Sequence, residues 1–244
     1  MDFPRLNLHI HSKYSDGRNS IKQIVRKSIE YKLKYIAMTD HFTNSWKAGI
    51  IPTLDSKEKI INYISEIKHC QNYLKREGID LKVFTGIEID ISSSKSYILN
   101  LINPYEFDII LFEYLESPEG IAFIKTLLKS WKKKYLKNKS FPILGLAHFD
   151  PSLFIYGYYD VLIPFLKEFN IYYEFNSSYS QYYAYKFQDF FYKLKENNIL
   201  VAIGCDSHNS ADLMNIEEPF NKIRDYKLEK NLGILIENLE SRED

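Results

Sequence analysis

Short apolar runs alternate with longer amphipathic segments along the chain, a pattern that predicts strands separated by helices. Most of the apolar runs have no polar face, which is typical of a parallel sheet covered by helices. The first expected strand begins at Leu6, and the other six span residues 35–40, 81–90, 107–115, 141–149, 171–178 and 199–208. Helices are expected at residues 20–33, 56–77, 119–137, 159–169 and 181–197, with one or two more at 213–240.

The first strand carries histidines on its polar side. Leu6, Leu8 and Ile10 alternate with polar residues that include His9 and His11, and a Ser-Asp-Gly turn follows. Successive side chains of a strand point to opposite faces, so residues two apart share a side. His9 and His11 are therefore expected to face the same way, where they can bind one metal ion together.

Five of the six histidines lie at the ends of expected strands, in the company of carboxylates. The histidines are His9, His11, His41, His148 and His208. The carboxylates are Asp16, Asp40, Glu88, Asp90, Glu113, Glu174 and Asp206. In a closed parallel barrel, the carboxyl ends of all strands meet at one face. A lone strand-end histidine is more often a hydrogen-bonded structural residue, but this many imidazoles and carboxylates together favour a divalent cation such as Zn²⁺, Mn²⁺ or Fe²⁺.

Composition and charge narrow the classes of function. The chain has 244 residues, 45% of them hydrophobic, and we expect one soluble domain over residues 1–244. The net charge is zero, so long nucleic acid is not an expected partner. The chain has two cysteines, no long apolar run and no signal-peptide character at its N-terminus, so we expect a cytoplasmic protein without a membrane segment. Nothing in the sequence indicates the oligomeric state.

Five motifs resemble, in order and approximate spacing, those of the PHP family, the polymerase and histidinol phosphatase domain. They are HIHSKYSDG, MTDH, GIEID, LAHF and GCDSH, and they extend from about residue 6 to residue 210. The combination is specific, although no single motif among them is. The resemblance implies an α/β fold, a distorted (β/α)7 TIM-like barrel with parallel strands. It also implies two or three bound divalent metal ions and the hydrolysis of phosphoesters.

Matched motif by motif, the resemblance also implies ligands for three metals. These are His9, His11 and Asp206 for the first metal, Glu88 and His148 for the second, and Asp16, His41 and His208 for the third. Glu88 would bridge the first two metals.

The chain departs from the family pattern on the fourth expected strand. Family members usually carry a histidine near the end of that strand, where this chain has DIILFEYLES. Glu113 or Glu116 could take the role, because carboxylate oxygen binds the same metals. Glu113 is preferred because it lies closer to the strand end. The alternative is a second metal site that is weak or absent.

Asp40 and Arg18 are the candidate catalytic residues. Asp40 could orient a ligand histidine or act as a general acid, and capping of the turn after the second strand is an equal alternative. Arg18 follows the Ser-Asp-Gly turn and could hold a phosphate oxygen through two hydrogen bonds. A solvent-facing arginine is the equal alternative there.

The function expected from these inferences is that of a metal-dependent phosphoesterase. Metals about 3.5–4 Å apart would share a hydroxide, which attacks phosphorus in line. The expected substrate is small, either a phosphomonoester similar to histidinol phosphate or a nucleotide. The alternative is a non-catalytic or regulatory PHP module that binds metal and acts as an interaction scaffold, which a degraded ligand set would favour.

Overall fold

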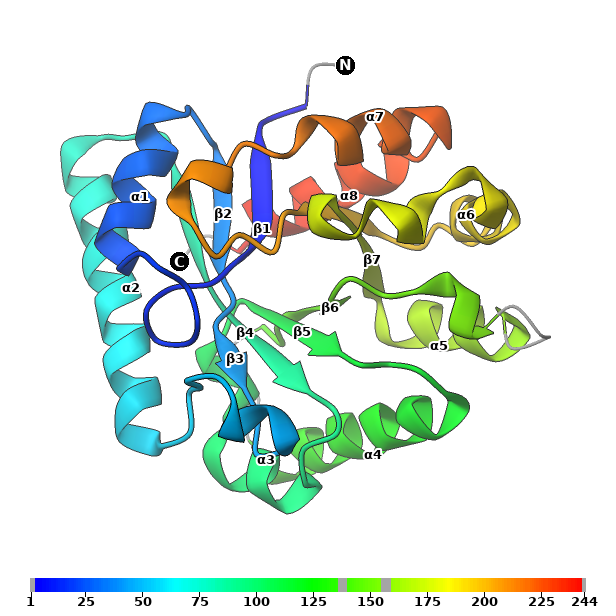
Figure 1. Ribbon diagram of the computed structural model, residues 1–244, viewed down its shortest axis with the longest axis horizontal. Helices are drawn as coiled ribbons and strands as arrows, with labels where there is room; N and C mark the ends of the chain where they lie inside the picture. The colour runs from blue at the N-terminus through cyan, green and yellow to red at the C-terminus, as the bar shows by residue number, and fades with distance from the viewer. Residues whose placement is uncertain (1–2, 136–139, 155–158, 243–244) are drawn as a thin grey trace.

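The computed structural model describes residues 3–135, 140–154 and 159–242, and its parallel sheet curls almost into a barrel (Figure 1). The strands along this sheet, in spatial order, are β1 (Leu6–Ile10), β2 (Tyr35–Met38), β4 (Lys82–Asp90), β5 (Ile109–Glu113), β6 (Ile143–Leu146), β7 (Ile171–Asn176) and β8 (Val201–Gly204). A parallel bridge between Ile10 and Ser207 joins the two ends of the sheet. The expected distorted barrel of seven parallel strands is therefore confirmed.

Helices surround the sheet, as Figure 1 shows. They are α1 (Ile21–Glu30), α2 (Lys57–Glu77), α3 (Lys95–Leu101), α4 (Pro118–Lys134), α5 (Tyr159–Phe169), α6 (Gln188–Glu196), α7 (Glu217–Asp225) and α8 (Glu229–Glu240). The first begins where the sequence pattern predicts, because the Ser20 side chain accepts a hydrogen bond from the Gln23 backbone N–H. Its apolar face, which includes Ile21 and Ile24, is buried. In the described part of the chain, no helix has the length and apolar character needed to cross a membrane.

Three features of the fold were not predicted. The short strand β3 (His41–Phe42) pairs with β4, and helix α3 follows β4 directly. Both are too short to show a hydrophobic period, and α3 buries only Ile98. The helix expected from residue 181 starts later, because 3₁₀ turns occupy Ser177–Tyr183 and Tyr185–Phe187. The expected end of the helix at 136–137 lies outside the described residues.

The register of the sheet brings candidate residues from different strands to one level. Glu88 of β4 is opposite His41 of β3, and Asp90 of β4 is opposite Glu113 of β5. All these side chains are at least nine-tenths buried. Because every strand pair is parallel, the carboxyl ends of the strands lie on the same side of the sheet, where residues far apart in sequence meet.

Candidate metal centre

The first group of candidate ligands consists of His9, His11 and Asp206, at the carboxyl ends of β1 and β8. The Nε2 atoms of His9 and His11 are 3.0 Å apart. Asp206 Oδ1 lies 2.9 Å from His11 Nε2 and 3.5 Å from His9 Nε2. The two histidines thus face the same way, as the alternation along the strand predicts. Three ligand atoms this close together suit one metal ion.

Glu174 on β7 orients the ring of His9. Its carboxylate accepts a hydrogen bond from His9 Nδ1 at 2.9 Å and another from the His148 backbone N–H at 2.7 Å. Because a carboxylate only accepts, Nδ1 carries a proton, and Nε2 is the atom left to bind a metal. Burial acts to lower the pKa of His9, but Glu174, Glu88 and Asp206 outweigh it and raise the pKa well above its ordinary value, so binding of a metal at Nε2 requires the loss of a proton. Gly204 makes room for this contact, since a Cβ at that position would come within 1.8 Å of Glu174 Oε1.

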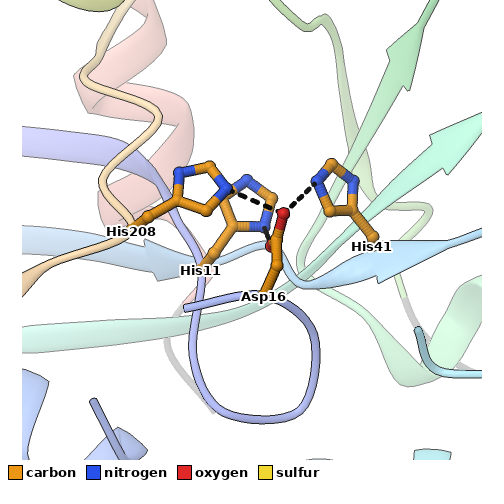
Figure 2. A group of neighbouring side chains, drawn as sticks. All are labelled: His11, Asp16, His41 and His208. Atoms are coloured by element: carbon orange, nitrogen blue, oxygen red, sulfur yellow. Dashed lines mark ion pairs between the residues drawn. The ribbon is translucent and has the colours of Figure 1, made fainter. Parts of the chain in front are cut away.

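The second group of candidate ligands consists of His11, Asp16, His41 and His208, and Figure 2 shows Asp16 among the three histidines. Asp16 Oδ2 lies 3.1 Å from His208 Nε2 and 3.6 Å from His41 Nε2. Asp16 Oδ1 lies 3.7 Å from His11 Nδ1. His11 therefore stands between the two groups, with Nε2 toward the first and Nδ1 toward the second.

Asp40 anchors the loop that carries Asp16. Its Oδ1 accepts hydrogen bonds from the backbone N–H groups of Ser12 and Ser15, at 2.8 and 3.0 Å, and from Ser15 Oγ at 2.7 Å. Its Oδ2 accepts from Ser12 Oγ at 2.8 Å. The carboxylate is fully buried, and both oxygens are engaged. These contacts hold the loop after β1 and not the turn after β2, so capping of that turn, orientation of a ligand histidine and general-acid catalysis all stay predictions for Asp40.

Loss of the Asp40 carboxylate should loosen this loop. We expect Asp40→Ala to lower the free energy of unfolding by about 2–4 kcal/mol, because it leaves buried backbone N–H groups without an acceptor. Denaturant unfolding measures the change, and elemental analysis should show weaker metal retention at the second group. Asp55→Ala is the control, since among the described residues that exposed side chain forms an ion pair only with half-buried Lys59. Unchanged stability with lost activity would instead assign Asp40 a catalytic role.

Arg18 lies beside the second group. Its backbone N–H donates to the His208 carbonyl oxygen at 2.8 Å, and its side chain is exposed. The exposed guanidinium agrees with either alternative from the sequence, and its contact with a phosphate stays a prediction.

Glu88 lies at the centre of the histidine cluster. Its Oε2 is 2.7 Å from His41 Nδ1 and 3.5 Å from His11 Nε2. Its Oε1 is 3.3 Å from His148 Nε2 and 3.4 Å from His9 Nε2. Each oxygen of this buried carboxylate thus faces two imidazoles. A bridging ligand occupies such a position.

Glu113 also points into the cluster, whereas Glu116 is exposed. Glu113 is fully buried, and with His41 and Glu88 it forms the third group of candidate ligands. Its Oε1 lies 3.5 Å from His41 Nδ1. No such group among the described residues includes His148, which reaches the cluster through Glu88.

Sequence analysis missed Lys47, the cation nearest to Glu113. Its Nζ lies 2.7 and 3.0 Å from the two Glu113 oxygens. Burial lowers the pKa of Lys47, but Glu113 and Glu88 outweigh this effect and raise it above its ordinary value. Lys47 is therefore charged at neutral pH. It belongs to the 3₁₀ turn Trp46–Gly49, which no strand or helix pattern indicates.

Several carboxylate oxygens of the cluster are buried without a hydrogen-bond partner in the described structure. They are Asp16 Oδ1, both oxygens of Glu88 and Asp206 Oδ1. Burial by itself would raise the pKa values of Glu88 and Asp206, but the neighbouring histidines outweigh it and hold both below their ordinary values. Buried ionised carboxylates need a compensating charge. The imidazole and carboxylate donors fit Zn²⁺, Mn²⁺ or Fe²⁺, so these residues fit the implied metals.

The histidines differ in their protonation. Burial, assisted by His41, lowers the pKa of His11 to about 4, so His11 is neutral near pH 7 and can act as a ligand. Burial also acts to lower the pKa of His41, but Glu88 and Glu113 outweigh it and raise the value to about 10. Binding of a metal to His41 therefore requires the loss of a proton.

The backbone is left-handed at three strand ends that border the cluster. The φ angles are +32° at His148, +48° at Asp206 and +64° at Tyr114, which follows Glu113. Residues other than glycine rarely adopt this conformation, and such strain collects at functional sites. Two of these positions, His148 and Asp206, are candidate ligands chosen from the sequence, and the third directly follows the candidate Glu113.

Comparison with known proteins gives one family and several related folds. A model of the PHP domain matches residues 7–150. A histidinol phosphate phosphatase from Lactococcus lactis, in complex with zinc, L-histidinol and phosphate, superposes with a TM-score of 0.63 at 16% identity, covering 92% of this chain and 94% of that chain. A structure from work on YwqE of Bacillus subtilis and CpsB of Streptococcus pneumoniae, metal-dependent tyrosine phosphatases, gives a TM-score of 0.52 at 17% identity, covering 91% and 93%. At these identities the likeness shows a common fold. No curated protein sequence matches the chain.

Proposed function

The chain belongs to the PHP domain family, and from this premise we propose that it is a metal-dependent phosphoesterase. The observation that carries the proposal is the set of buried carboxylate oxygens that lack hydrogen-bond partners and face histidine nitrogens. A degraded ligand set would favour the scaffold alternative, whereas three groups of candidate ligands are assembled here. The intact ligand groups therefore favour an enzyme over the scaffold alternative.

The side chains present suit two or three divalent cations. We assign His9, His11 and Asp206 to one, Asp16, His41 and His208 to another, and Glu88, Glu113 and His148 to a third position that shares Glu88 with the first. Cations bound there would activate water as a nucleophile and neutralise phosphate oxygens. Glu174 fixes the tautomer of His9, and Asp40 fixes the loop of Asp16. Arg18 is exposed beside this cluster and is our candidate for holding a phosphate oxygen.

The proposed substrate is a small phosphomonoester. The related phosphatase from Lactococcus lactis was crystallised with L-histidinol and phosphate, and the YwqE and CpsB proteins are described as tyrosine phosphatases. Histidinol is an alcohol and tyrosine is a phenol, so these proteins support a phosphate ester of an alcohol or a phenol as the substrate class. The zero net charge of this chain supports a small substrate over long nucleic acid.

Hydrolysis of a generic aryl phosphate tests the proposal. Purified protein supplied with Mn²⁺, Zn²⁺ or Fe²⁺ should release the phenol with at least one metal, and a chelator should abolish the activity. A screen of phosphorylated metabolites under the same conditions would then rank the substrates.

Two histidine variants serve as a matched pair in this assay. His11→Ala removes a residue of the first and second groups and should abolish turnover. His69→Ala removes an exposed imidazole of helix α2 and should leave turnover unchanged. Metal binding without turnover of any phosphoester in the screen would support the scaffold alternative.

A further inference from the structure

Lys47 places a positive charge inside the third group of candidate ligands. Its Nζ contacts both oxygens of Glu113 and lies 3.3 Å from His41 Nδ1. Only 13% of the Lys47 side chain is exposed, and Glu113 is fully buried. The ammonium thus already neutralises the carboxylate that we assign to a metal.

Buried groups hold the loop that carries this lysine. Thr43 Oγ1 donates a hydrogen bond at 2.8 Å to Oδ2 of fully buried Asp90, and Ser45 Oγ donates to the same oxygen. Ser45 Oγ also accepts from the Lys47 backbone N–H at 3.3 Å. The backbone of Lys47 is therefore fixed at the site by the end of β4, and its side chain is not a freely moving surface lysine.

An ammonium and a divalent cation cannot both bind Glu113 at full strength. Two cations on one carboxylate repel each other, and the repulsion is strong where burial excludes water. A metal must either displace the Lys47 ammonium or bind beside it, and both weaken its binding. In the described structure, no lysine or arginine forms an ion pair with a residue of the first group.

We propose that Lys47 is an internal counter-cation that competes with the metal for Glu113 and makes this position the weakest of the metal centre. The inference rests on the proposed metal-dependent function. Lys47 then determines how much metal is needed to fill the centre, without contributing a ligand of its own.

Metal affinity, measured by chelator competition from protein loaded with Mn²⁺ or Zn²⁺, tests the inference without reference to activity. Lys47→Met removes the charge and keeps most of the side-chain volume. It should tighten the weakest metal position by roughly ten-fold or more, because a buried repulsive charge is lost. Lys47→Arg keeps the charge and should retain the wild-type affinities. Lys59→Met is the matched control, since the Lys59 ammonium contacts the Thr53 carbonyl oxygen and Asp55.

A double variant separates competition for Glu113 from a general electrostatic effect. In a Glu113→Ala background, Lys47→Met should produce no gain in affinity, because the shared carboxylate is absent. An equal gain in that background would overturn the inference, as would unchanged or weaker binding in Lys47→Met alone. If the wild type binds metal but Lys47→Met shows no tighter binding, the inference about Lys47 is wrong and the proposed function stands. If the wild type binds no metal at all, both the inference about Lys47 and the proposed metal-dependent function are wrong.

Discussion

Glu88→Gln should reduce phosphoesterase turnover by at least about 100-fold, beyond the 10- to 100-fold typical of losing a partner that only supports a ligand. The carboxylate of Glu88 lies within 3.5 Å of four imidazoles, those of His9, His11, His41 and His148. An amide of the same shape has no negative charge, so it cannot balance two cations. Elemental analysis should therefore show the loss of more than one metal equivalent per chain.

A surface carboxylate provides the comparison for this variant. Glu237 on helix α8 is exposed, and Glu237→Gln should change the free energy of unfolding by less than about 0.5 kcal/mol and leave the metal content intact. Near-normal kinetics and metal content in Glu88→Gln would mean that the reactive centre lies elsewhere on the molecule.

The barrel could be predicted because its signals are local and repeated. Each main strand is a short apolar run, and the helices between strands show their own period, as Ile21 and Ile24 do in α1. A parallel sheet follows from that alternation, and the shared face of His9 and His11 follows from the two-residue period of a strand. The elements that were missed, β3 and α3, are too short to carry a period.

Residue types at strand ends revealed candidate ligands but not the contacts that support them. Glu113 was preferred over Glu116 from its place on the strand, and it is the one of the two that reaches the cluster. The sequence left several roles open for Asp40. The hydrogen bonds that its carboxylate accepts come from the Ser12–Ser15 loop, and the conformation of this loop cannot be predicted from a hydrophobic pattern. The contact between Lys47 and Glu113 could not be predicted from the sequence. It depends on the conformation of a loop that has no hydrophobic periodicity.

The position of Glu113 leads to the second prediction with a large effect. Glu113→Ala should remove about one metal equivalent at saturating metal and leave the first group filled, because His9, His11 and Asp206 make no contact with Glu113 in the described structure. Glu113→His should restore the lost equivalent, since imidazole binds the same ions and the Lys47 ammonium loses the carboxylate that attracts it. Turnover should fall and recover in the same order.

Elemental analysis of the wild type and both Glu113 variants shows whether Glu113 is a metal ligand or only the ion-pair partner of Lys47. Glu116→Ala is the control, because that exposed side chain lies three residues further along and outside the cluster. An unchanged metal count in Glu113→Ala would show that Glu113 serves only Lys47, and the centre would then hold metal at the first and second groups alone. A gain of metal in Glu113→His but no loss in Glu113→Ala would lead to the same conclusion. At the position where family members usually carry a histidine, this chain would then have a carboxylate, Glu113, whose charge is neutralised by the Lys47 ammonium and not by a metal.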